Sequence, residues 1–243
     1  MHMKQFALFP RPAVALLTMG LWNCGGDLTL PSSSAAGLAV TVVGGNGQTG
    51  SVGDTLPDPV VVVVRTDAGD PMAGRRVAFV RSGGDPAAGF DPDTAVTNAQ
   101  GQAVARWVLG TAPGAYTGEA RVVAEGDTAV PTATLQAAAI AGAPDTVRPT
   151  GPTSQPGRRG EPLADPLVVM VVDRYGNAVV GAEVRWDASG GNGEFSEKKA
   201  QTAVDGTSSV TWTLGNRIGV QRATATVGSI AGSPVTFTAT VLF

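Results

Sequence analysis

The sequence predicts an all-β protein made of two tandem immunoglobulin-like antiparallel β-sandwiches. Two long stretches of the chain resemble each other at an offset of 107 residues, which is the length of a whole domain. The apolar segments are short and β-branched, and turn signals between them are spaced for about seven strands per hundred residues. No segment has helical periodicity, so strands are expected throughout.

The repeat and the composition divide the chain of 243 residues into four parts. The hydrophobic fraction of 43% is high enough to build packed cores, and each copy is long enough for a core of its own. The expected parts are a signal peptide (1–23), a lipid-anchored flexible tether (24–37), a first Ig-like domain (38–140) and a second one (144–243).

Each copy carries the same signals in the same order. The motif Leu-x-Asp-Pro precedes an apolar run at Leu56 and at Leu163, and Trp-x-Leu-Gly follows at Trp107 and at Trp212. Repetition of Asp-Pro in both copies predicts a shared structural role, such as an Asp side chain that bonds backbone N–H groups where a strand begins. The offset falls to 105 between the motifs, so one loop is longer in the first copy.

The strands follow from the local pattern. An unbroken β-branched run suits a central strand that is covered on both faces or capped on its outer face by loops. Segments that alternate polar and apolar residues place one row of side chains, including the tryptophans, on an inner face. The clearest expected strands are 60–64, 75–80, 167–172, 182–186, 211–214, 224–227 and 235–241.

The motif order resembles the bacterial Ig-like domain of the invasin/intimin type. The second copy carries it most fully, with Gly-Asn-x-x-x-Gly-x-x-Val-x-Trp from Gly176, Asp-Gly at Asp205, and Phe-x-Ala-Thr from Phe237. The first copy departs from it, since Asp70 stands where the family has Asn. The resemblance covers nearly all of residues 38–243 and implies modules at a cell surface that act in adhesion or as spacers.

The N-terminal residues predict export. An apolar run at 13–21 follows Lys4 and Arg11, and it is too short to span a bilayer but suits a signal-peptide core. Cys24, the only cysteine, comes just after it and resembles the lipobox of bacterial lipoproteins, although Asn23 replaces the small residue usual there. We expect lipidation at Cys24 and a place in the cell envelope, at the outer membrane or cell surface; secretion without a lipid is the alternative.

Charge and residue types narrow the function. Removal of residues 1–23 takes the net charge from −3 to −5 and leaves no basic patch, so a nucleic-acid partner is not expected. The only histidine is His2, so the chain that remains after this removal has none. His-dependent catalysis and His-ligated zinc are therefore excluded for it. Lys198 and Lys199 are the only lysines left, and their adjacency argues against a lysine nucleophile. No catalytic, cofactor or metal residue is predicted.

The remaining polar and aromatic signals each have two readings. Acidic residues in the loops could hold calcium or catalyse glycoside hydrolysis, but acids also solvate loop tips. The tryptophans could form a sugar-stacking platform, but their equivalence in both copies favours a core position. The loop acids and the tryptophans concerned are Asp85, Asp91, Asp93, Glu194, Glu197, Trp107, Trp186 and Trp212.

We therefore expect a non-enzymatic envelope protein that works through its surfaces. The membrane is the expected partner through the N-terminal lipid, and a protein or glycan ligand is left open. The alternative function is a carbohydrate-binding module attached to the envelope, which requires exposed aromatic side chains. The loops at 82–96 and 189–201, where the copies differ most, are the places to look for a binding site.

Overall fold

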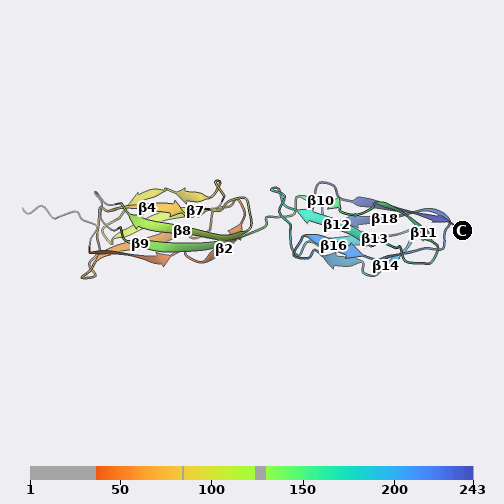
Figure 1. Ribbon diagram of the computed structural model, residues 1–243, viewed down its shortest axis with the longest axis horizontal. Coiled ribbons are helices and arrows are strands. Elements are labelled where there is room, and N and C mark those ends of the chain that lie inside the picture. The colour runs from red at the N-terminus through yellow and green to blue at the C-terminus, as the bar shows by residue number, and fades with distance from the viewer. Residues whose placement is uncertain (1–36, 84, 124–129, 243) are drawn as a thin grey trace, which may run out of the picture. The chain divides into compact units, whose positions relative to one another are not determined.

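The computed structural model describes residues 37–83, 85–123 and 130–242 (Figure 1). All of the regular elements in these ranges are strands, and none of these segments forms a helix that could cross a membrane. The first half contains β1 (Leu38–Gly44), β2 (Gln48–Ser51), β3 (Val60–Thr66), β4 (Arg76–Arg81), β5 (Gly89–Asp91), β6 (Thr94–Val96), β7 (Gln102–Val108), β8 (Gly114–Val122) and β9 (Thr132–Ile140).

The second half repeats this order. It contains β10 (Thr146–Pro149), β11 (Ser154–Arg158), β12 (Leu167–Val172), β13 (Glu183–Asp187), β14 (Gly193–Phe195), β15 (Lys199–Gln201), β16 (Thr207–Val210), β17 (Trp212–Leu214), β18 (Gly219–Thr226) and β19 (Val235–Leu242).

Each half is a sandwich of two facing sheets. In the first sandwich (β1–β9) the sheet orders are β1-β3-β7-β5 and β2-β9-β8-β4-β6. In the second sandwich (β10–β19) the strands β10-β12-β16 and the pair β14-β17 lie opposite β11-β19-β18-β13-β15. The predicted all-β fold of two immunoglobulin-like sandwiches is confirmed.

One strand pair in each sandwich is parallel, whereas the sequence predicted only antiparallel pairs. β2 runs parallel to β9, and β11 runs parallel to β19. In the first sandwich the chain leaves β1 in one sheet and enters β2 in the other through Gly45. That glycine has φ +72°, and a Cβ on it would lie 2.1 Å from the carbonyl oxygen of Pro59. Only glycine allows the two backbones to approach so closely.

The core of each sandwich lies between its two sheets. In the first, Val60, Val62 and Val64 of β3 and Trp107 of the neighbouring strand β7 belong to the same core cluster, and all four are fully buried. Burying a side chain of this size stabilises a fold by about 1.5–3 kcal/mol. The segments that alternate polar and apolar residues also have the predicted inner face, because Val77, Phe79, Val184 and Trp186 are at most 3% exposed.

The outer face of the central strand is partly covered, as the apolar run predicted. Val63 is only 4% exposed, although it points away from the core row of β3. On β12 the outward Met170 is half-buried, and the guanidinium of Arg148 on β10 lies 3.6 Å from its sulfur. A neighbouring side chain thus covers part of this face in the second sandwich.

Candidate functional site

The predicted lipid site lies outside the described residues. Cys24 and Asn23 belong to residues 1–36, and lipidation of the thiol stays a prediction from the sequence. The loops at 82–96 and 189–201, apart from residue 84, lie within the described part of the chain, as do Trp107, Trp186 and Trp212. Within that part, no group of three acidic, histidine or cysteine side chains is placed to hold a metal ion.

Asp85 holds its loop to a neighbouring loop of the first sandwich. Its carboxylate accepts hydrogen bonds from the hydroxyl and the backbone N–H of Thr111, and from the N–H of Ala87 at 2.9 Å. The Thr111 hydroxyl, followed by these backbone N–H groups, lowers the pKa of Asp85 to about 2. Gly110 leaves room for this contact, because a Cβ there would lie 2.6 Å from the Cβ of Asp85. The carboxylate therefore has a structural role.

The other two acids of this region point to solvent. Asp91 and Asp93 are exposed, and they follow Phe90, whose ring packs between Phe79 and Trp107 at centroid distances of 5.8 and 4.8 Å. The backbone carbonyl of Asp93 accepts a hydrogen bond from the N–H of Phe79. The segment is thus fixed by its aromatic ring and its backbone, while the carboxylates lie on the surface.

In the matching region of the second sandwich the acids are likewise exposed, and other groups fix the loop. Glu194 and Glu197 are exposed, whereas the carbonyl of Asn192 accepts a hydrogen bond from the indole N–H of Trp212 at 2.9 Å. Asn192 also donates its side-chain amide to the carbonyl of Ser189 at 2.5 Å. In both loops the fixed groups are therefore aromatic rings and backbone atoms, and these acids lie at the surface.

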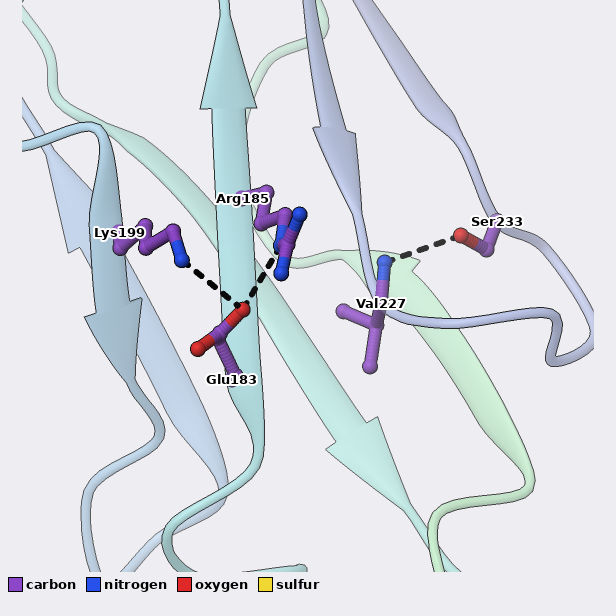
Figure 2. A network of polar contacts seen from close by, with 5 residues as sticks. All are labelled: Glu183, Arg185, Lys199, Val227 and Ser233. Carbon is purple, nitrogen blue, oxygen red and sulfur yellow. Dashed lines mark hydrogen bonds and ion pairs between the residues drawn. The ribbon is translucent and has the colours of Figure 1, made fainter.

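Lys199 takes part in an ion-pair cluster on the surface of β13 and β15 (Figure 2). The carboxylate of Glu183 lies 2.7 Å from Arg185 and 3.8 Å from Lys199. The hydrogen bond from Arg185 and the charge of Lys199 lower the pKa of Glu183. All three side chains are at least half exposed, so this cluster is solvated and contributes little to stability.

The tryptophans are core residues. Trp107 and Trp212 are 0% exposed and Trp186 is 3% exposed, so none of the three offers a face to a sugar. In the second sandwich Phe195 and Phe237 pack against Trp186 at centroid distances of 5.9 Å. The sugar-stacking platform considered from the sequence is therefore not formed by these tryptophans.

The repeated Asp-Pro sequence has a different partner from the one expected. The side chain of Gln48 bonds both backbone groups of Asp58, at 2.8 and 3.0 Å, and Gln155 bonds those of Asp165 in the same way. The glutamine thus satisfies the backbone where the strand begins, and the Asp side chains are exposed. Both glutamines were visible as a repeated pair, but their partners lie ten residues away in the sequence.

A second polar clamp was missed by the sequence analysis. The hydroxyl of Thr202 donates to the carbonyl of Val179 at 2.6 Å and accepts from the N–H of Ala182 at 2.9 Å. Thr97 makes the equivalent pair of bonds in the first sandwich. The signal in the sequence was repetition of Thr at the same position of both copies.

The turn after β12, which we call the junction loop (Asp173–Asn177), holds the most buried acid among the described residues. Asp173 is 2% exposed and accepts four hydrogen bonds, from the backbone N–H of Gly142, Tyr175 and Asn177 and from the amide of Asn177. Burial acts to raise its pKa, but these hydrogen bonds outweigh burial and lower it. Asp173 is therefore a charged acceptor buried in a turn.

Comparison with known proteins gives a likeness of fold. No family model matches the sequence, and no curated protein matches it. Similar solved structures include the D0–D1 domains of intimin (21% identity, 82% of this chain, 94% of that chain, TM-score 0.31) and the Escherichia coli adhesin FdeC (20%, 86%, 65%, 0.47). Invasin, described as a bacterial integrin-binding protein, has 23% identity over 84% of this chain and a TM-score of 0.36, and the chain spans 39% of that structure.

Proposed function

We propose that this chain is a non-catalytic lipoprotein of the cell envelope that presents two Ig-like sandwiches as a spacer or adhesion module. The observation that carries this proposal is what the two copies share. The shared polar side chains of Gln48, Gln155, Thr97 and Thr202 all bond backbone groups of their own sandwich. Duplication of a scaffold is what a module that works by reach and surface needs.

The side chains that differ between the copies point the same way. Asp85 is bonded to Thr111 inside its own sandwich, and the other loop acids are solvated. The motif resemblance to invasin/intimin-type domains favours display at a cell surface. Diacylation of the Cys24 thiol together with an amide-linked acyl chain would provide the attachment. A single acyl chain would not suffice, because it binds a membrane only marginally.

The anchor is tested by metabolic labelling with a palmitate analogue and by protease treatment of intact cells. We expect the wild-type chain to take up the label and to be cleaved on intact cells. The Cys24→Ala variant should lose the label and appear in the medium or the soluble envelope fraction. Asn23→Gly, which restores a small residue before the cysteine, serves as the control and should keep the label. Equal label and equal location of wild type and Cys24→Ala would contradict the lipoprotein proposal.

The choice between spacer and adhesion module needs a binding measurement. The full chain on cells is compared with Cys24→Ala cells for attachment to immobilised matrix proteins and glycans. Attachment that depends on the anchored chain supports adhesion, and equal attachment supports a spacer. Saturable binding of the full chain to one glycan class would instead support the carbohydrate-binding alternative.

A further inference from the structure

The junction loop makes hydrogen bonds that leave its own sandwich. The side-chain amide of Asn177 donates to the carbonyl oxygen of Thr111, between β7 and β8 of the first sandwich, at 2.8 Å. Asp173 accepts a hydrogen bond at 2.9 Å from the N–H of Gly142, which lies in the linker (141–145) between β9 and β10. One turn thus bonds both the linker and a loop of the preceding sandwich.

A third residue of the loop fits closely against the first sandwich. A Cβ built on Gly53 would lie 2.1 Å from the hydroxyl oxygen of Tyr175, so any larger residue at position 53 would require this tyrosine to move. Gly53 has φ +76°, and its N–H donates to the carbonyl of Gly110 next to Thr111. The guanidinium of Arg174 lies 4.6 Å from the centre of the Tyr175 ring and supports it from within the loop.

The loop is held in one conformation by its own hydrogen bonds. The carboxylate of Asp173 accepts from the N–H of Tyr175 and of Asn177 and from the amide of Asn177, each at 2.9 Å. Charge-assisted bonds in a buried site are stronger than neutral ones. The groups that reach the first sandwich are therefore oriented before they make contact.

The two copies differ at these positions. The first copy has Thr66, Ala68 and Asp70 where the second has the Asp, Tyr and Asn of the junction loop. The hydroxyl of Thr66 accepts from the N–H of Asp70 at 3.2 Å, so the polar contact stays within the turn. Ala68 has no side chain long enough to reach another domain. The residues of the second copy that contact the first sandwich are thus not present at the equivalent positions of the first copy.

We propose that the junction loop is a docking surface whose partner is the end of the first sandwich formed by Gly53, Thr111 and the linker. Asp173 orients the loop, while Tyr175 and Asn177 make the contacts that couple the two sandwiches. This inference goes beyond the proposed function, because it holds whatever the two modules bind.

The test is hydrogen exchange of the full chain, followed in peptides that cover the linker. Asn177→Asp introduces the residue of the first copy and removes the donor to Thr111. Tyr175→Ala removes the contact with Gly53. Each substitution releases the loop from the first sandwich and so loosens the bond between Asp173 and the N–H of Gly142. We therefore expect both to speed exchange of the Gly142 amide about tenfold or more. The matched control, Asp70→Asn, changes the equivalent turn of the first copy and should leave linker exchange unchanged.

A pair of glycine variants separates docking from local strain. Gly53→Ala and Gly160→Ala impose the same backbone strain, since the glycines have φ values of +76° and +72°. Only the first places a methyl group against Tyr175; at Gly160 the nearest atom is 3.3 Å away, on Asn216. Gly53→Ala should therefore speed linker exchange, and Gly160→Ala should not.

Exchange in the peptides of β8–β9 and β18–β19 shows whether each sandwich remains folded. Unchanged linker exchange in folded Asn177→Asp and Tyr175→Ala would overturn the proposal. So would equal effects of the two glycine variants on the linker, because the contact with Tyr175 would then play no part. If Gly53→Ala unfolds the first sandwich, the exchange measured in Asn177→Asp and Tyr175→Ala decides the result.

Discussion

Replacing Thr202 by valine removes a hydroxyl without opening a cavity, because the two side chains have nearly the same shape. The hydroxyl connects the carbonyl of Val179 and the N–H of Ala182, and all three residues are less than 9% exposed. Valine offers neither a donor nor an acceptor to these two backbone groups. The substitution therefore tests the value of one polar clamp with little change in packing.

The expected cost follows from the groups that lose their partner. A buried backbone group without a hydrogen-bond partner costs about 1–3 kcal/mol, and Thr202→Val leaves two. The carbonyl of Val179 and the N–H of Ala182 lie close to the surface, since the neighbouring Val180 is 59% exposed. Water can approach the two groups after a modest rearrangement, which keeps the cost below the full sum. We therefore expect the free energy of unfolding of the second sandwich to fall by about 2–3 kcal/mol.

The first sandwich provides an internal comparison. Thr97 makes the same two bonds, to the carbonyl of Met72 and from the N–H of Arg75, but these two residues are half-buried. Water can replace more of the lost bonding there, so Thr97→Val should cost about 1 kcal/mol. The order of the two costs depends on burial alone, since the chemistry is the same.

The measurement is urea unfolding of the full chain, read by pulsed hydrogen exchange so that peptides from each sandwich report separately. A single curve for the whole chain would not suffice, because two domains need not unfold together. Thr240→Val, on the exposed face of β19, is the control and should change stability by less than about 0.5 kcal/mol. Equal costs for Thr97→Val and Thr202→Val, or a cost for Thr202→Val as small as that of the control, would refute the reasoning.

Three further predictions use the same assay. Gly206→Ala should destabilise the second sandwich by about 2–3 kcal/mol, because φ is +75° and the new Cβ would lie 2.8 Å from the carbonyl oxygen of Val171. Its control is Gly69→Ala, where φ is +89° but no atom lies within 4 Å of the new Cβ; this substitution should cost about 1 kcal/mol. Trp212→Ala should cost about 3–5 kcal/mol, and a smaller loss would mean that the indole is not a core residue. Hydrogen bonds, led by the one from the Thr111 hydroxyl, lower the pKa of Asp85 to about 2. The stabilisation by the Asp85 carboxylate is therefore fully present above its unfolded pKa of about 4 and is lost as the pH falls through 2. Asp85→Asn should flatten the pH dependence of the first sandwich's stability between these two values, and an unchanged profile would contradict the assignment.

Local patterns predicted the strands and the core well. The alternation around Trp186 and Trp212 indicates one buried face, because side chains of a strand alternate with period two. The unbroken apolar run of β3 instead indicates a strand covered on both sides, and the outward Val63 is 4% exposed. Strand pairing was less accessible, since the parallel pairing of β2 with β9 joins residues about ninety positions apart. Nothing near Gln48 in the sequence indicates that its strand leaves the sheet of β1.

The polar residues were harder to interpret for the same reason. A repeated Gln or Thr shows that a role exists, but the bonded partner of Thr202 lies 23 residues away at Val179. Asp85 is bonded across 26 residues to Thr111, and its loop has no close counterpart in the second copy. Such roles depend on which loops the sheets bring together, and residue type and spacing do not determine that.

A difference between the copies is informative only once its contacts are known. Tyr116 and Gln221 occupy equivalent positions and look like a change of function, yet each bonds backbone carbonyls of the same loop of its own sandwich, at Ala112 and at Gly215. The side chain is a phenol in one copy and an amide in the other, but both donate to a carbonyl of that loop. At Asn177 the reverse holds, because an Asn for Asp exchange turns a local turn residue into a donor to the other sandwich. The search for partner surfaces should therefore follow the differences whose contacts leave their own sandwich.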